Sequence, residues 1–76
     1  MKSHGMTGQD VEEGEVLDAL SKNVKGCKRG ALVRLLRGRK VFKEAGKTAH
    51  DIKTLILQMA IDRKITKDAA DYYTAN

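Results

Sequence analysis

Proline and tryptophan are absent from the 76 residues of this chain, and its aromatic side chains are limited to Phe42, Tyr72 and Tyr73. The core must therefore be built mainly from aliphatic side chains. Cys27 is the only cysteine, which excludes an internal disulfide and is typical of a reducing compartment. No apolar run approaches the ~18–20 residues of a membrane span, and no signal-peptide core is visible. The sequence thus predicts a soluble protein of the cytoplasm or nucleoid, without a membrane partner.

Positive charge is abundant, and it is concentrated in one segment. Between Lys22 and Lys47 stand ten basic residues and a single acid, Glu44, so this basic block has a net charge of +9. The first twenty residues carry −4, and residues 48–76 are neutral overall. Like charges held together repel one another, and an external polyanion would relieve the repulsion. Nucleic acid is the commonest such partner. The alternatives are an ordinary solvated surface or contact with an acidic protein or membrane surface.

Three amphipathic stretches, separated by glycine-bearing breaks, predict three helices at about 10–23, 27–38 and 49–63. Asp10 and Glu13 have capping-box spacing at the first start, and Thr48 and Asp51 have it at the third. Residues 1–9 lack periodicity and are predicted to be flexible. The residues predicted to be buried are Val16, Leu17, Ala19, Leu20 and Val24 in the first helix, Leu32, Leu35 and Leu36 in the second, and Ile52, Leu55, Ile56, Met59 and Ala60 in the third.

The segments outside these helices are less regular. Residues 39–47 predict a flexible basic connector whose apolar pair, Val41 and Phe42, packs on the core. The tail, 64–76, fits either a small hairpin or a short fourth helix capped by Thr66, and its tyrosines and threonines favour the hairpin. Leu57 and Ile61 lie off the buried face of the third helix. They could form a dimer contact, be covered by the tail, or be exposed.

This order of elements resembles a winged helix-turn-helix domain. The segments Val16–Leu20, Ala31–Leu36, Ile52–Ile61 and Lys64–Tyr73 carry the resemblance, which spans residues 10–76 as a single domain. It implies a mainly α fold of three helices with a small C-terminal β-hairpin wing, and a small transcription regulator that binds double-stranded nucleic acid, with DNA favoured over RNA. The family joins its second and third helices by a short turn, whereas 39–47 is longer and basic. Which helix would enter a groove therefore stays open.

The predicted binding residues have two roles, because phosphate contacts position a protein while base-edge contacts specify sequence. The candidates for phosphate contact are Lys28, Arg29, Arg34, Arg37, Arg39, Lys40, Lys43 and Lys47. The resemblance implies that Thr48, His50, Lys53 and Thr54, at the exposed start of the third helix, read bases. It also implies that Lys64 or Lys67 contacts phosphate from the wing. The scarcity of aromatic side chains argues against a specialist for single strands.

The acidic N-terminal segment and the Leu57/Ile61 pair suggest a second function, a small helical regulator that dimerises and binds another protein. The acids could fold over the basic block of their own chain or meet that of a neighbouring subunit. The simpler interpretation is that Glu12, Glu13 and Glu15 complement the helix dipole.

Evidence for an enzyme is weak. Gly46-Lys47-Thr48 matches the end of a phosphate-binding P-loop, but the required first glycine is replaced by Val41. Cys27 lies beside Lys25, Lys28 and Arg29, which favour a thiolate, yet no positioned base or second thiol accompanies it. His50 has no neighbouring ligands at metal spacing. The sequence therefore predicts no catalytic residue, metal, cofactor or small-molecule substrate.

Overall fold

A computed structural model describes residues 8–75, so most of the segment predicted to be flexible, 1–9, lies outside the described residues. Within 8–75 the chain forms four helices and three strands, in the order α1 Gly8–Ser21, β1 Cys27–Lys28, α2 Arg29–Arg37, α3 Lys40–Glu44, α4 Ala49–Ile61, β2 Ile65–Lys67 and β3 Tyr72–Ala75. The fold is mainly helical with a small antiparallel sheet, which confirms the coarse prediction of a small α domain.

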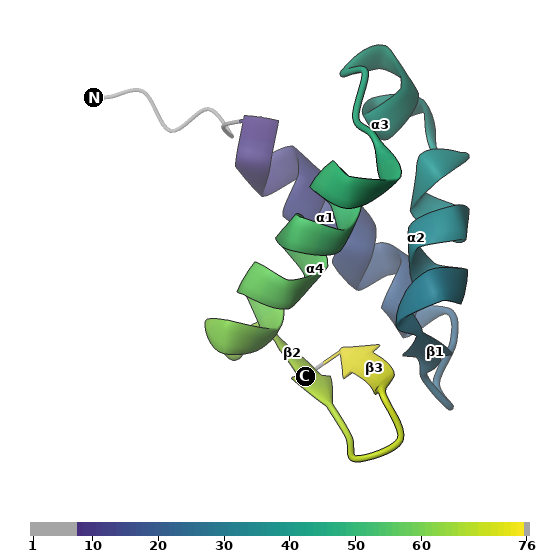
Figure 1. Ribbon diagram of the computed structural model, residues 1–76, viewed down its shortest axis with the longest axis vertical. Helices are drawn as coiled ribbons and strands as arrows, with labels where there is room; N and C mark the ends of the chain where they lie inside the picture. Colours follow the sequence, from purple (N-terminus) through teal and green to yellow (C-terminus); the bar gives the residue numbers. More distant parts are fainter. Residues whose placement is uncertain (1–7, 76) are drawn as a thin grey trace.

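The helices cross at the centre, and the sheet closes one end of the molecule. In Figure 1, α1 passes behind α4, and α2 lies beside both. The short helix α3 lies at the end opposite the hairpin of β2 and β3. None of the helices in this part of the chain is both long and apolar enough to cross a membrane.

Helix α1 begins two residues earlier than predicted, so Asp10 lies inside it and the expected Asp10–Glu13 capping box is wrong. The helix ends at Ser21, where the Asn23 side chain donates a hydrogen bond to the Ala19 carbonyl at 2.8 Å. Val24 lies beyond this end and is 86% exposed, so its predicted burial is also wrong. Gly26 then turns the chain with φ +89°.

Residues 27 and 28 were predicted to start the second helix, but they form strand β1. Cys27 pairs with Tyr73, and Lys28 pairs with Tyr72, in an antiparallel register. Strand β3 also pairs with β2, so the sheet order is β1-β3-β2. The tail is therefore the favoured hairpin and not a fourth helix. Its turn is held by Asp68, whose Oδ1 accepts hydrogen bonds from the backbone N–H groups of Ala70 and Tyr72, each at 2.9 Å.

The predicted connector is folded rather than flexible, because residues 40–44 form α3 and bury Phe42 in the core. Val41 is half-buried. Gly46, with φ +67°, ends α3: its N–H donates to the Lys43 carbonyl, and the Lys47 N–H donates to the Phe42 carbonyl at 3.0 Å. This pattern is a Schellman motif, in which a left-handed residue satisfies the last carbonyls of a helix. Gly46 therefore serves as a helix stop.

Helix α4 begins at the predicted place and is fixed by the predicted cap. Thr48 Oγ1 accepts from the Asp51 N–H at 3.2 Å, and Asp51 Oδ2 accepts from the Thr48 N–H at 3.1 Å, so the capping box is confirmed. The helix stops at Ile61 instead of Arg63. Arg63 adopts φ 62°, and the Lys64 N–H donates to the Met59 carbonyl at 2.9 Å.

Each of the four helices and three strands contributes at least one side chain to the core. Its largest fully buried members are Tyr73, Phe42, Leu20, Leu32, Leu36, Ile52, Ile56, Met59, Ile65 and Val16. Leu55, Leu57 and Ala60 are partly buried against this cluster. Leu35 was predicted to be buried, but it is 47% exposed at the margin of α2. Leu17, also predicted to be buried, lies at the surface of α1.

Candidate nucleic-acid interface

The outer face of α2 carries two arginines that make no ion pair with any residue of 8–75. At ~100° per residue, Arg34 and Arg37 project from the side opposite the buried Leu32 and Leu36. Both are exposed, and no carboxylate among the described residues lies within ion-pair distance of either. Their guanidinium groups are therefore available to an external anion.

Two of the connector's cations, Arg39 and Lys47, are different, because α1 supplies them with acids. Glu12, Glu15 and Asp18 stand three residues apart on α1, and we refer to these three as the acidic stripe. Arg39 Nη1 donates to Asp18 Oδ2 at 2.8 Å and to Glu15 Oε1 at 3.1 Å. These hydrogen bonds raise the pKa of Arg39, the one donated to Asp18 having the larger effect. The same hydrogen bond is the main cause that lowers the pKa of Asp18.

Lys47, at the other end of the connector, lies 3.7 Å from Glu12 Oε2. The acidic stripe therefore meets the connector at both ends. Of the interpretations that the sequence left open for the acidic segment, these contacts match the one in which it folds over the basic block of its own chain. Lys40 is also paired, with Glu44 at 3.8 Å, but both of those side chains are largely exposed.

Ion pairing divides the basic block into two sets. Within the described part of the chain, four of its ten cations have a carboxylate partner: Lys22, Arg39, Lys40 and Lys47. The other six have none: Lys25, Lys28, Arg29, Arg34, Arg37 and Lys43. Lys28 lies over the Tyr72 ring, 5.7 Å from its centroid, and Arg29 is half-buried. This second set, which we name the unpaired cations, is concentrated on and before α2.

The start of α4 presents the residues that the resemblance assigned to base reading. Thr48 is occupied by the capping box, and its backbone N–H is the main cause that lowers the pKa of Asp51. His50, Lys53 and Thr54 are exposed. The Thr54 hydroxyl donates to the His50 carbonyl at 3.0 Å. His50 and Lys53 have no hydrogen-bonding or ion-pair partner for their side chains among the described residues.

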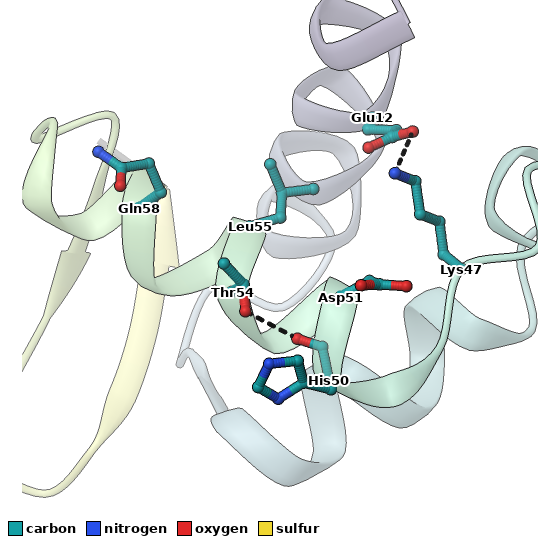
Figure 2. A pocket seen from close by; sticks show the side chains of 7 residues that line it. All are labelled: Glu12, Lys47, His50, Asp51, Thr54, Leu55 and Gln58. Atoms are coloured by element: carbon teal, nitrogen blue, oxygen red, sulfur yellow. Dashed lines mark hydrogen bonds and ion pairs between the residues drawn. The ribbon is translucent and has the colours of Figure 1, made fainter.

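A groove runs between α1 and α4 and is lined by Glu12, Lys47, His50, Asp51, Thr54, Leu55 and Gln58, with a volume of about 670 Å³. Figure 2 shows Glu12 and Lys47 at one end of it, with Leu55 and Gln58 further along α4. Its charges are mixed. Because these residues mark the flank of α4 toward α1, helical geometry places Lys53 and Leu57 on the flank toward α2, which packs against α4. Lys53 thus lies on the same side of α4 as the unpaired cations.

The hairpin contributes less positive charge than expected. Lys64 Nζ donates to Glu13 Oε1 at 2.8 Å, and this contact is the main cause that raises the pKa of Lys64. Lys67 pairs with Asp71 at 3.1 Å across the turn. With Asp68 also in the turn, its tip carries two acids and one base.

The structure of residues 8–75 bears on the metal site and the reactive cysteine that were considered from the sequence. No group of three or more His, Cys, Asp or Glu side chains is placed to hold a metal ion there. Cys27 is buried, and burial raises the pKa of its thiol. Burial opposes the thiolate that its basic neighbours in the sequence suggested, because Cys27 belongs to the hydrophobic core cluster.

No protein-family model, no curated protein and no solved structure matches this chain. The site must be judged from its own geometry. Sequence reasoning found the cations but did not identify which of them form ion pairs with acids of α1. A signal was present: acids at 12, 15 and 18 share one face of a helix, as residues three apart do. Their partners could not be named until the fold placed Arg39 and Lys47 beside that face.

Proposed function

We propose that this protein binds double-stranded nucleic acid, with DNA favoured over RNA, as a small regulatory protein. The observation that carries the proposal is the set of unpaired cations on and before α2, together with Lys53 on the adjoining flank of α4. A surface that leaves this many cations without acids, while the acids of the same chain pair elsewhere, is suited to a polyanion. Binding would be driven by release of counterions from the phosphates.

The arrangement of elements supports the same proposal. A helix, a strand, two further helices and a hairpin, with the first strand joined to the hairpin in the order β1-β3-β2, is consistent with the winged helix-turn-helix resemblance. The connector 39–47, which is longer than the turn of that family, contains the short helix α3. In this proposal α4 presents His50, Lys53 and Thr54 to base edges, and Arg34 and Arg37 hold phosphates. The acidic hairpin tip has a minor role.

The alternative, a dimeric regulator that binds a protein through Leu57 and Ile61, has less support. Leu57 packs partly against the core, which leaves Ile61, 73% exposed, as the apolar residue on that face. A single exposed isoleucine needs no special explanation on a protein surface. Light scattering to measure particle mass is the direct test of this alternative.

The proposal is tested by fluorescence anisotropy of a labelled DNA duplex over a salt series. If about five phosphates are neutralised, log K should fall against log salt with a slope of about −4 to −5. The double variant Arg34→Gln/Arg37→Gln should bind more weakly, and its slope should be shallower by about 2. Duplex RNA and single-stranded DNA, used as competitors, measure the preference for duplex DNA.

The matched control is Lys22→Gln/Lys67→Gln, which removes the same charge from two cations that are already paired with Asp18 and Asp71. It should retain most of the affinity and the wild-type slope. Absence of duplex binding at low salt contradicts the proposed function. An equal loss in both double variants would show that net charge, rather than the α2 surface, is responsible.

A further inference from the structure

The acidic stripe of α1 competes for the same kind of cation that a nucleic acid would bind. Its three carboxylates lie opposite the two ends of the connector, where Arg39 and Lys47 stand. Both lysine and arginine bind phosphate and carboxylate oxygens through charge-assisted hydrogen bonds. A cation held by the stripe is therefore withheld from a phosphate.

The two ends of the connector are held with different strength. Arg39 reaches two carboxylates at 2.8 and 3.1 Å, and its side chain is 25% exposed, so it is fixed between α1 and α3. Lys47 has one partner at 3.7 Å, which is longer than a good charge-assisted hydrogen bond, and its side chain is 37% exposed. Lys47 can therefore exchange partners, whereas Arg39 is a structural link.

Lys47 also has the better position. It directly precedes the Thr48 cap of α4 and lines the end of the groove that contains His50 (Figure 2). A lysine released there would reach a phosphate next to the start of α4. Asp51, its other acidic neighbour in the groove, is already bound to the Thr48 N–H.

We propose that Glu12 is an intramolecular competitor of nucleic-acid phosphate: by holding Lys47 it lowers affinity, so that neutralising Glu12 adds one phosphate contact. This inference rests on the proposed function and concerns how the affinity of that surface is limited. It assigns regulation of binding to an α1 residue that lies outside the unpaired cations.

The test is a double-mutant cycle on duplex DNA with Glu12→Gln, Lys47→Gln and the combined variant. Glu12→Gln should bind more tightly than wild type and steepen the salt slope by about 0.9. The affinity ratio of this variant to wild type should then fall about eightfold for a tenfold rise in salt. Lys47→Gln alone should leave the slope unchanged, and it should erase the gain in the combined variant.

Asp62→Asn is the matched control, since it removes one negative charge at the far end of α4, where the carboxylate accepts a hydrogen bond from Gln58. It should leave the salt slope at the wild-type value. Thermal unfolding of each variant establishes that it is folded before binding is measured.

The outcomes separate the two proposals. If wild type binds duplex DNA but Glu12→Gln leaves the slope unchanged, the competitor role is overturned and the proposed function stands. If the gain persists without Lys47, Glu12 merely repels phosphate and the competitor role is again overturned. A shallower slope in Lys47→Gln alone overturns it independently. If neither wild type nor Glu12→Gln binds, both proposals fail.

Discussion

Arg39 is tied to Asp18 across 21 residues of sequence by a hydrogen bond of 2.8 Å, which joins the start of the connector to the last turn of α1. A residue predicted to contact phosphate thus has a partner within its own chain. The link joins the start of α3 to α1, and Phe42, one turn further along α3, is buried in the core. Two arginines only two residues apart therefore differ in role: Arg39 is held by acids of α1, whereas Arg37 has no carboxylate partner among the described residues.

The first prediction contrasts these two arginines. Arg39→Gln should lower the free energy of unfolding by about 1 kcal/mol, near the upper end for partly exposed ion pairs, which is roughly 4–8 °C in Tm for a domain of this size. Its salt slope for duplex DNA should stay at the wild-type value. Arg37→Gln should leave Tm unchanged and make the slope shallower by about 0.9. The two effects are measured by circular dichroism and anisotropy, and reversed effects would contradict the division of the basic block.

The second prediction concerns acid stability. Asp18 and Asp51 have pKa values below the ordinary 3.8, held there mainly by Arg39 and by the Thr48 backbone N–H respectively. A carboxyl group whose pKa is lower in the folded chain contributes stability above its unfolded value and loses it as pH falls through the folded value. Tm should therefore change little from pH 7 to about 5 and fall below about pH 4.

The double variant Asp18→Asn/Asp51→Asn tests whether these two carboxylates cause the fall in Tm at low pH. It should be less stable than wild type at pH 7 and should lose less stability between about pH 5 and 2, because two of the groups that must be protonated are gone. Thermal unfolding followed at several pH values gives both quantities. If Tm of the variant falls as steeply at low pH as that of wild type, other carboxylates are responsible for the loss of stability.

The parts of the fold that could be predicted from the sequence are those whose signal is local. The α4 cap needs only Thr48 and Asp51, and the helix periodicity is read within a few turns. Strand β1 could not be predicted this way, since two residues have no periodicity and Cys27 gains its structure from pairing with Tyr73 far along the chain. The helix α3, five residues long, is likewise stabilised by burying Phe42.

The candidate site follows the same rule. Its cations were visible as a run in the sequence, and the outward direction of Arg34 and Arg37 followed from helical spacing. Which cations carry partners depended on how α1 crosses the connector, and that is a tertiary relationship. The buried Glu13, paired with Lys64 across 51 residues, is a further case. Charge counts locate a basic surface, but only the fold shows which charges on it are available.

The third prediction tests why β1 forms after Gly26. A Cβ at this position would lie 2.9 Å from Thr74 Cγ2 and 3.0 Å from the Tyr73 carbonyl oxygen, and φ is +89°. Gly26→Ala should therefore lower the free energy of unfolding by about 2 kcal/mol or more, from backbone strain and overpacking. The matched control is Gly14→Ala, on an open part of α1, which should stabilise by up to about 1 kcal/mol. Equal effects at the two sites would show that close approach of β3 does not constrain Gly26.

The fourth prediction is a core substitution that should not destabilise the protein. Tyr73 is fully buried, and its hydroxyl has no hydrogen-bond partner in the described part of the chain. A buried polar group without a partner is destabilising by about 1–3 kcal/mol, so Tyr73→Phe should be neutral or raise the free energy of unfolding by about 1 kcal/mol. Tyr72→Phe, on the half-buried neighbouring ring, is the control and should change stability little. Denaturant unfolding measures both. A loss of more than about 1 kcal/mol in Tyr73→Phe would mean that the hydroxyl has a partner in solution, such as a buried water.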